Sequence, residues 1–546
     1  MIAGKPSTIN DDYQLNVIKI LKHAAKVYPK REIASRSIFG IHRYSYSQAY
    51  ERVCAIANAL EKLGVKAGDV VGLLGFNTHR FYESYFSIPS LGAVLLPLNL
   101  RLPPQDLLYI LKHSEVKGLL VDDFMVPIAE MIAPQHDFDF FVIMSERKEV
   151  DTKLDPAYSY EELVEENEKT REWDEIDERS AATACYTSGT TGKPKGVYFS
   201  HRSIYLHALT GAAYLRIGPE DCYMQIVPMF HANGWGGHIG STMVGSKLVF
   251  PGFFTLENVD VLVDLIVKEG VTVTHAAPVI LIPMLEYLRK LDPKPDLTGL
   301  RIGSGASEPP VAMMKGFAKF GVEIIHAYGA TETSPLVTLN FIKPELQLSE
   351  EEYWEYKKYQ GLPVLGVEVK VMTGDKEDKE APWDGKTMGE LWIRGIWVTK
   401  EYYRDERTKD SFADGWWKSG DVAVITPEGY VKIVDRVKDV IKSGGEWISS
   451  VDLENTLMAH PAVLEACVIG VEHPKWQERP LAFVVLKPGE EATKEELTEF
   501  LKSRFAKWQL PDDILFVDEI PKTSVGKFDK RALREKYRKY LIERSG

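Results

Sequence analysis

The segment from Tyr186 to Val197 gathers side chains and backbone groups that could hold a polyanion. It reads Tyr-Thr-Ser-Gly-Thr-Thr-Gly-Lys-Pro-Lys-Gly-Val, with five hydroxyl side chains, three glycines and two lysines. Glycines leave backbone N–H groups accessible, while hydroxyls and ammonium groups add donors and positive charge. A nucleotide triphosphate is therefore the first ligand that the segment suggests. A solvated surface loop is the plainer alternative.

The segment does not follow the P-loop pattern, in which Gly-Lys-Ser/Thr opens a helix. Gly189 and Gly192 are three residues apart, and Pro194 follows Lys193. Proline lacks an N–H and disfavours the helical conformation in the residue before it, so we expect no helix through Lys193. Phosphate binding here needs a different kind of loop.

A second motif runs from Val227 to Trp235 and places His231 and Trp235 in a glycine-containing turn. A structural histidine is the plain interpretation of His231. No aspartate occurs between Val227 and Gly240. Because an unpaired carboxylate is costly to bury, its absence favours an apolar substrate at this place.

Three more motifs carry polar groups that a nucleotide could use. Tyr328–Ser334 holds Glu332 among hydroxyls, which suits Mg²⁺ or, equally, the start of a helix. Gly303–Ser307 begins like a dinucleotide fingerprint but has Glu308 where the last glycine belongs, which excludes a Rossmann site. Asp421 is expected in a turn before the strand Val422–Ile425.

The last two motifs lie near the C-terminus. Residues 435–447 alternate in charge and contain a glycine pair, which is typical of a solvated linker and also suits a hinge. Lys527 follows Val525 and Gly526, with Lys522 and Lys530 nearby. A lysine in such a place is ordinarily just exposed.

In this order, the motifs resemble those of the adenylate-forming superfamily, which includes acyl-CoA synthetases, firefly-type luciferases and peptide-synthetase adenylation domains. The likeness extends from about residue 20 to 540, and residues 435–454 are most similar to medium- to long-chain fatty-acyl members. The chain is identified as a member of the AMP-forming acyl-CoA synthetases, or fatty-acid–CoA ligases.

The resemblance implies a role for each matching residue. Lys527 would be the catalytic lysine, His231 a catalytic residue that also lines the acyl pocket, and Trp235 its gate. Glu332 and Thr187 would hold the metal, and Asp435 and Lys438 would form the hinge. The implied ATP- and AMP-binding residues are Thr187, Ser188, Gly189, Thr190, Thr191, Gly192, Lys193, Lys195, Gly305, Ala306, Ser307, His326, Ala327, Tyr328, Gly329, Thr331, Asp421, Arg436, Lys442 and Trp447.

The implied reaction has two steps and uses Mg²⁺, ATP and CoA. A carboxylic acid attacks the α-phosphorus of ATP and releases pyrophosphate, and CoA then displaces AMP from the acyl adenylate. The small C-terminal domain would rotate between the two steps. An aryl-acid or coumarate-type CoA ligase is the alternative enzyme, and a catalytically silent nucleotide-binding homologue is the alternative outside enzymes.

Composition limits the partners. Lysine and arginine total 66 against 79 aspartates and glutamates, and a formal net charge of -13 argues against nucleic acid. The four cysteines are scattered, which fits a reducing cytoplasm. No apolar run is long enough for a transmembrane segment. Small-molecule substrates are thus the expected partners, and a homodimer, which fatty-acyl members can form, stays open.

The pattern of apolar runs predicts an α/β fold with largely parallel stacked sheets. Strands are expected at Val70–Leu74, Ala93–Leu96, Gly118–Val121, Phe140–Ile143, Val271–Ala276 and Val322–His326, alternating with helices. Short alternating strands after Gly361 predict a small β-barrel-like subdomain, and the C-terminus reads as a small mobile α+β domain. The predicted parts are a large domain 1–434 with its β-rich subdomain at about 361–434, a hinge 435–440 and a small domain 441–546.

Overall fold

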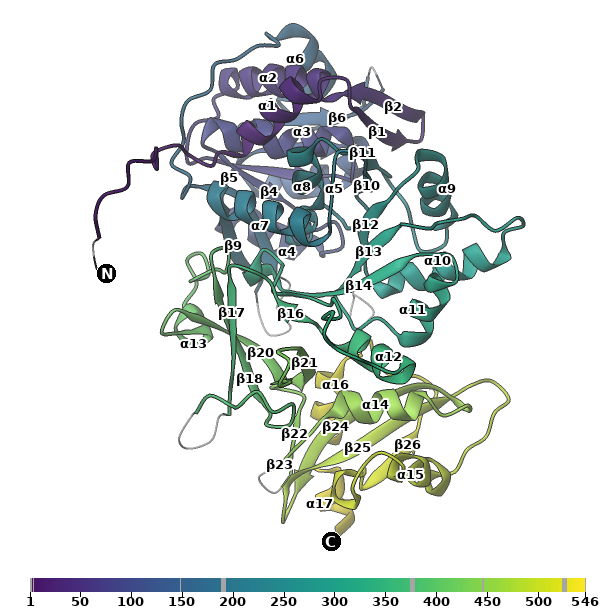
Figure 1. Cartoon of the computed structure of the whole chain (residues 1–546). Helices are drawn as coiled ribbons and strands as arrows, with labels where there is room; N and C mark the ends of the chain where they lie inside the picture. Colours follow the sequence, from purple (N-terminus) through teal and green to yellow (C-terminus); the bar gives the residue numbers. More distant parts are fainter. Residues whose placement is uncertain are drawn as a thin grey trace. The chain divides into compact units, whose positions relative to one another are not determined.

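The computed structural model describes residues 2, 4–147, 149–187, 193–373, 379–443, 446–522 and 528–545. The chain divides into two compact units (Figure 1). The first comprises Met1–Glu368 with Arg394–Trp417, and the second comprises Val369–Ile393 with Lys418–Gly546. The predicted domain boundary at residue 435 remains a prediction.

A seven-stranded sheet in the first unit has the order β7-β6-β5-β3-β4-β8-β9, in which β8 and β9 pair antiparallel and the other pairs are parallel. Apolar side chains of this sheet pack against α4 and α5. The elements are β3 (Val70–Leu74), β4 (Val94–Pro97), β5 (Val116–Asp122), β6 (Phe140–Met144), β7 (Ala157–Ser159), β8 (Ala181–Thr187), β9 (Lys195–Ser200), α2 (Tyr46–Lys62), α3 (His79–Ser87), α4 (Pro104–His113), α5 (Val126–Ile132) and α6 (Tyr160–Glu166). Continuous apolar runs such as Val70–Leu74 are what strands buried on both faces require.

A nine-stranded sheet completes the first unit, in the order β16-β15-β14-β13-β12-β10-β11-β1-β2. Its central pairs are parallel, and α9, α10 and α11 pack on β10 and β12 to β14 (Figure 1). The strands are β1 (Glu32–Ser37), β2 (Gly40–Ser45), β10 (Cys222–Met224), β11 (Lys247–Phe250), β12 (Val273–Ala276), β13 (Arg301–Ser304), β14 (Glu323–Tyr328), β15 (Thr338–Leu339) and β16 (Leu362–Pro363). The helices are α1 (Val17–Val27), α7 (His201–Tyr214), α8 (Gly237–Val244), α9 (Asp260–Glu269), α10 (Pro278–Lys290), α11 (Val311–Ala318) and α12 (Glu350–Lys358).

Two five-stranded sheets follow along the chain. The first has the order β17-β18-β20-β19, with β21 paired to β20, and the second has the order β23-β22-β25-β24, with β26 paired to β25. The elements of the first are β17 (Val367–Met372), β18 (Gly389–Gly395), α13 (Thr408–Ser411), β19 (Phe412–Ala413), β20 (Trp416–Ile425) and β21 (Val431–Arg436). Those of the second are β22 (Ile441–Ser443), β23 (Glu446–Ile448), α14 (Ser450–Met458), β24 (Val463–His473), β25 (Gln477–Leu486), α15 (Lys494–Lys502), β26 (Asp513–Phe516), α16 (Lys530–Tyr537) and α17 (Tyr540–Ser545).

The C-terminal sheet buries both of its faces. Successive residues of a strand point to opposite faces, so β24 serves two cores at once. Ala466 and Val468 lie in the core formed with α14 and α15, whereas Cys467 and Ile469 lie in the core formed with α16 and α17. The helices are thereby fixed on the two sides of one small sheet.

The α/β fold class with its small α+β C-terminal part is confirmed, and the predicted strands recur with shifted ends. One local prediction was wrong. Asp421 lies within β20 rather than in a turn, because it pairs with Arg436 of β21, and the strand continues through Gly420 although that residue has φ 71°. Within the described residues, no helix is long and apolar enough to cross a membrane.

Candidate functional site

The glycine-rich segment joins two paired strands. Thr187 ends β8 and Lys195 begins β9, and these two residues face each other in the antiparallel register. Opposed residues of an antiparallel pair project to the same face, so the hydroxyl and the ammonium group lie on one side. Residues 188–192, which include Ser188, Gly189, Thr190, Thr191 and Gly192, lie outside the described residues.

The two lysines of the segment have different surroundings. The Lys195 Nζ lies 3.8 Å from the centre of the Tyr402 ring and 4.0 Å from Glu332 Oε1. Burial lowers the pKa of Lys195 below its ordinary value, although the Glu332 carboxylate acts in the opposite direction. Lys193 is exposed, with its Nζ 5.0 Å from the centre of the Tyr109 ring. Lys195 is thus the fixed cation and Lys193 the accessible one.

Glu332 is a buried carboxylate held by a hydroxyl. It lies in the short turn η5 (Thr331–Thr333) after β14, and it is 7% exposed. Tyr402 Oη donates a 2.7 Å hydrogen bond to Glu332 Oε1, and the backbone N–H of Thr399 donates to the Glu332 carbonyl oxygen at 2.8 Å. This turn lies against β8, which ends at Thr187. A carboxylate, an ammonium group and a hydroxyl therefore gather where β8 and β14 end.

Thr187 adds an oxygen without a hydrogen bond. Its Oγ1 is buried and has no partner among the residues that the structure describes. Buried polar atoms are nearly always hydrogen-bonded, so an orphan at the edge of a site suggests that a ligand supplies the partner. The site is built to receive a polar ligand.

The candidate adenine residues lie together at the ends of neighbouring parallel strands β13 and β14. A Cβ on Gly305 would lie 2.7 Å from the carbonyl oxygen of Ala327 and 3.1 Å from the Trp235 ring, so a side chain does not fit there. Ala306 has φ 69°, and Ala306 and Ser307 are exposed. Ligands of α/β sheets commonly bind at such strand ends.

Three further predicted residues lie on and after β14. Tyr328 and Gly329 are half-buried, and a Cβ on Gly329 would come within 1.5 Å of the Pro335 carbonyl oxygen. His326 is 2% exposed, and its Nδ1 lies 2.9 Å from the Lys358 carbonyl oxygen. Burial lowers the pKa of His326 to about 4, so the ring is neutral and turned toward the protein. Its side chain is therefore held by the fold.

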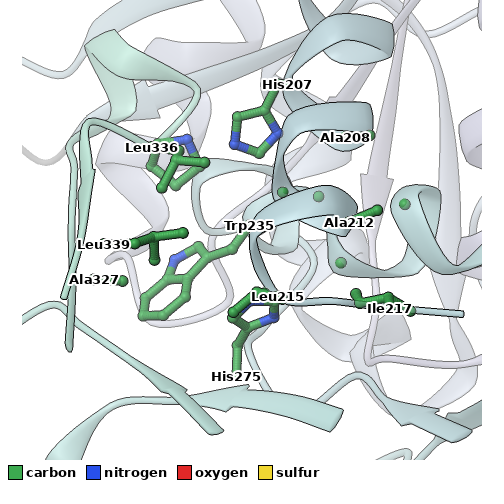
Figure 2. Close-up of a pocket in the computed structure, with 15 residues that line it drawn as sticks. His207, Ala208, Ala212, Leu215, Ile217, Trp235, His275, Ala327, Leu336 and Leu339 are labelled. Carbon is green, nitrogen blue, oxygen red and sulfur yellow. The ribbon is translucent and has the colours of Figure 1, made fainter. Parts of the chain in front are cut away.

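An apolar cavity opens beside Trp235 (Figure 2). The empty space within it, counted together with the solvent at its open mouth, is about 490 Å³. Helices α7 and α8 contribute small residues to the lining. In Figure 2 the Trp235 indole lies between these helices and Leu339. The lining residues are His207, Ala208, Gly211, Ala212, Leu215, Ile217, Trp235, Gly236, Gly237, Gly240, His275, Ala327, Pro335, Leu336 and Leu339.

The backbone around Trp235 is unusual. Asn233, Gly234, Trp235 and Gly236 have φ values of 47°, 65°, 60° and 70°. Left-handed conformations are costly for residues other than glycine and persist only where the surroundings hold them. Here the Gln225 side chain donates to the carbonyl oxygens of Val227 and Gly234 at 2.7 and 3.1 Å. His231, at the start of this turn, is exposed.

Two histidines of the cavity escaped the sequence analysis. His207 is on α7 and His275 is on β12, and burial lowers their pKa values to about 3 and about 4. Both rings are therefore neutral at physiological pH. His275 Nδ1 lies 2.9 Å from Tyr223 Oη, and its ring meets Trp235 edge-on at 5.8 Å between centroids. No local motif marks these residues; their position beside Trp235 depends on the packing of separate elements.

The second unit holds another group of predicted residues. Asp421 on β20 and Arg436 on β21 are paired in register, and Arg436 Nε lies 2.8 Å from Asp421 Oδ1. Asp421 is 4% exposed, whereas the Arg436 side chain is 54% exposed. Lys442 and Trp447 face each other across the β22–β23 pair, with the Lys442 Nζ 5.8 Å from the indole centre. Lys438 is exposed.

Lys527 lies outside the described residues, but the two neighbouring lysines are described. Lys522 Nζ lies 2.5 Å from Glu465 Oε1, and Lys530 Nζ lies 2.8 Å from Glu454 Oε1. Both ammonium groups are thus committed to carboxylates within the second unit. They are poor candidates for a cation that must reach a substrate.

Comparison with known proteins decides the family. Residues 21–403 match the family described as AMP-binding enzyme, and residues 452–527 match the AMP-binding enzyme C-terminal domain. The chain belongs to the AMP-binding enzymes. The predicted kinship with the adenylate-forming acyl-CoA synthetases is confirmed, and so is the enzyme class of acid–thiol ligases.

Several relatives match almost from end to end. The chain is 45% identical to a long-chain-fatty-acid–CoA ligase of Thermus thermophilus, with 98% of each chain covered. It is 38% identical to a medium-chain-fatty-acid–CoA ligase of Ectopseudomonas oleovorans, over 97% of this AMP-binding enzyme and 98% of the relative. A crystal structure of the anthranilate CoA ligase AuaEII with anthranoyl-AMP is similar with a TM-score of 0.81 and 26% identity, over 97% of this chain and 99% of that one.

Replacing Tyr402 with phenylalanine tests the support of Glu332. Tyr402→Phe removes the hydroxyl that donates to the buried carboxylate, so we expect the free energy of unfolding to fall by about 1–3 kcal/mol. Urea unfolding of the nucleotide-free protein measures it. Tyr403→Phe, which removes a hydroxyl from the adjacent ring, is the matched control and should cost less. Equal losses in both variants would contradict a special contribution from the Glu332–Tyr402 bond.

Proposed function

We propose that this enzyme is a fatty-acid–CoA ligase that activates medium- or long-chain acids. ATP and the acid give an acyl adenylate and pyrophosphate, and CoA then gives the thioester and AMP. The observation that carries the choice of acid is the cavity beside Trp235, whose described lining contains no carboxylate and no ammonium group. Since His207 and His275 are neutral, the cavity favours an apolar acyl chain over a charged substituent.

The polar cluster beside this cavity suits the ATP phosphates. Lys195, fixed between Glu332 and Tyr402, places a positive charge there, and Lys193 supplies a second, exposed one. Negative charge grows on the phosphate oxygens and on the leaving pyrophosphate during adenylation. Fixed cations lower the free energy of that transition state more than that of the ground state.

The same cluster fits Mg²⁺ bound to ATP. In nucleotide sites Mg²⁺ uses one or two carboxylates together with the substrate phosphates, so a large acidic cluster is unnecessary. Indeed, the described residues contain no group of three or more histidine, cysteine, aspartate or glutamate side chains suited to a metal. Glu332 and the orphaned Thr187 Oγ1 would hold the ion. Once bound, Mg²⁺ offsets the charge of the phosphates.

Residues of the second unit would complete the cycle. Asp421 has two acceptor oxygens suited to the ribose hydroxyls, with Arg436 beside it. Lys527 would stabilise the adenylation transition state and leave when a hinge at Asp435 and Lys438 turns. The commitment of Lys522 and Lys530 to carboxylates supports the choice of Lys527. A homodimer and a cytoplasmic location also remain expectations.

An aryl-acid CoA ligase is the second candidate. The similarity to the anthranilate CoA ligase favours it, and so do the flat rings of Trp235 and His275 in the cavity. A planar acid could stack or meet these rings edge-on, gaining about 0.5–1.5 kcal/mol per aromatic pair. Measured rates with fatty acids and with aryl acids are needed to distinguish the two candidates.

A panel of acids tests the function itself. With ATP, Mg²⁺ and CoA, acids from acetate to palmitate, cinnamate and benzoate are compared by AMP release. We expect kcat/KM to be highest for a fatty acid, because the cavity is apolar and free of charge. Omission of CoA is the control and should remove steady-state AMP release. A maximum at benzoate or cinnamate would support the aryl alternative, and absence of AMP release with every acid would indicate a silent homologue.

Lys527→Ala tests the division between the half-reactions. Loss of one donor to a developing charge costs about 10²–10³ in rate, so acid-dependent ATP–pyrophosphate exchange should fall by that factor. Thioester formation from supplied acyl adenylate should change little. Lys502→Ala, which removes an exposed lysine of α15, is the control and should keep both activities. An equal fall of both half-reactions in Lys527→Ala would contradict the assigned role.

Trp235→Ala tests the wall of the cavity. Removal of the indole leaves space for a longer or bulkier acyl group, so the acid giving the highest kcat/KM should shift, while the KM for ATP stays nearly the same. The panel of acids measures the shift. Trp383→Ala, which changes an exposed indole, is the control. An unchanged acid profile would show that Trp235 does not select the acid.

A further inference from the structure

A buried ionic cluster in the second unit joins the proposed hinge residue Asp435 to three residues that have no role in the chemistry described above, Ser450, Glu454 and Lys530. Lys530, the first residue of α16, donates from Nζ to Ser450 Oγ at 2.7 Å and lies 2.8 Å from Glu454 Oε1. Ser450 in turn donates from both its backbone N and its Oγ to Asp435 Oδ2, each at 2.6 Å. The Asp435, Ser450 and Glu454 residues are 3%, 0% and 6% exposed.

The cluster holds one positive charge against two carboxylates. Burial alone would lower the pKa of Lys530, but Glu454 and Asp435 raise it above its ordinary value, so the ammonium persists. An ion pair of this kind is expensive to dismantle, because loss of one partner leaves a buried charge. The cluster is therefore a firm connection between α16, α14 and β21.

One end of this connection lies beside the predicted catalytic lysine in the sequence. Lys522 and Phe528 form an isolated antiparallel β-bridge, and the Asp529 N–H donates to the Pro521 carbonyl oxygen at 2.7 Å. The chain before and after residues 523–527 is thus brought together. Lys522 is paired with Glu465 of β24, so both sides of this junction are fastened to the C-terminal sheet and its helices.

The other end lies beside the predicted ribose residues. Asp435 directly precedes Arg436, which pairs with Asp421 across β20 and β21. A second link runs parallel to the first: Arg534 on α16 donates to Asp439 Oδ1 at 2.7 Å. Helix α16 is therefore attached at two places to the segment that carries Asp435 and Arg436.

We propose that Lys530 and Ser450 are positioning residues for adenylation. Through Asp435 they set the chain next to Lys527 at a defined place relative to Asp421 and Arg436. The proposal rests on the proposed function, because it assumes that Lys527 acts in the first half-reaction. Neither Lys530 nor Ser450 touches substrate in this role.

Ser450→Ala is the decisive variant, because it removes the hydroxyl that joins Lys530 to Asp435. The Ser450 N–H can still donate to Asp435, and the Lys530–Glu454 ion pair stays intact. Thr456→Ala is the matched control: it removes another buried hydroxyl of α14, which donates to the Asp452 carbonyl oxygen at 2.9 Å. A misplacement of about 1 Å can cost about 10²-fold in rate, so we expect kcat of ATP–pyrophosphate exchange to fall about 10- to 100-fold in Ser450→Ala. The KM for ATP should change less than about threefold, and so should the rate of thioester formation from supplied acyl adenylate. Both changes would be much smaller than the loss of about 10²-fold that misplacement can cause.

Conservative replacement of the lysine supplies a second measurement. Lys530→Arg keeps the charge and the donors and should retain more exchange activity than Lys530→Gln, which leaves Glu454 and Asp435 uncompensated. Unchanged exchange in Ser450→Ala would overturn the proposal. So would equal losses in both half-reactions, or equal losses in Ser450→Ala and Thr456→Ala, since these indicate general destabilisation. If the unaltered enzyme catalyses neither half-reaction, the proposed function fails first and the positioning role fails with it.

Discussion

The burial of the Glu332 carboxylate is the constraint around which the first unit is arranged. A carboxylate that is 7% exposed needs a hydrogen-bond donor and a nearby cation, and Tyr402 and Lys195 provide them from distant parts of the sequence. Lys195, the first residue of β9, and Tyr402 must therefore both lie next to the turn that follows β14 and carries Glu332. The seven-stranded sheet, the nine-stranded sheet and the segment before α13 therefore meet at one polar cluster.

Much of the fold was predictable because its sheets are buried on both faces. The apolar runs of β3 and β6 predicted almost the true bounds of these strands, since a short run of apolar residues is what a strand buried on both faces requires. Short or amphipathic strands such as β1, β2 and β10 were missed. Asp421 looked like a turn former because of Gly420, but hydrogen bonding to β21 carries the strand through it.

The candidate site was predictable only where its motifs are contiguous. Thr187, Lys195 and Glu332 stand in segments whose residue types already indicate phosphate and metal chemistry, and the structure brings these three together. His207 and His275 could not be found in the same way, because α7 and β12 meet beside Trp235 only after folding. Likewise, the role of Tyr402 follows from its hydrogen bond to Glu332, a residue 70 positions away in the sequence. Contacts between distant segments are what sequence patterns do not encode.

The chain of bonds from Lys530 to Asp435 bears on how such enzymes can be recombined. A chimera joined at residue 441 would take Ser450 and Lys530 from one parent and Asp435 from the other. The junction would pass through an ionic cluster whose members balance one another, so parents that differ at any of these positions would leave a buried charge without its partner. A crossover between the two compact units, near Lys418, would take all residues of the cluster from the same parent.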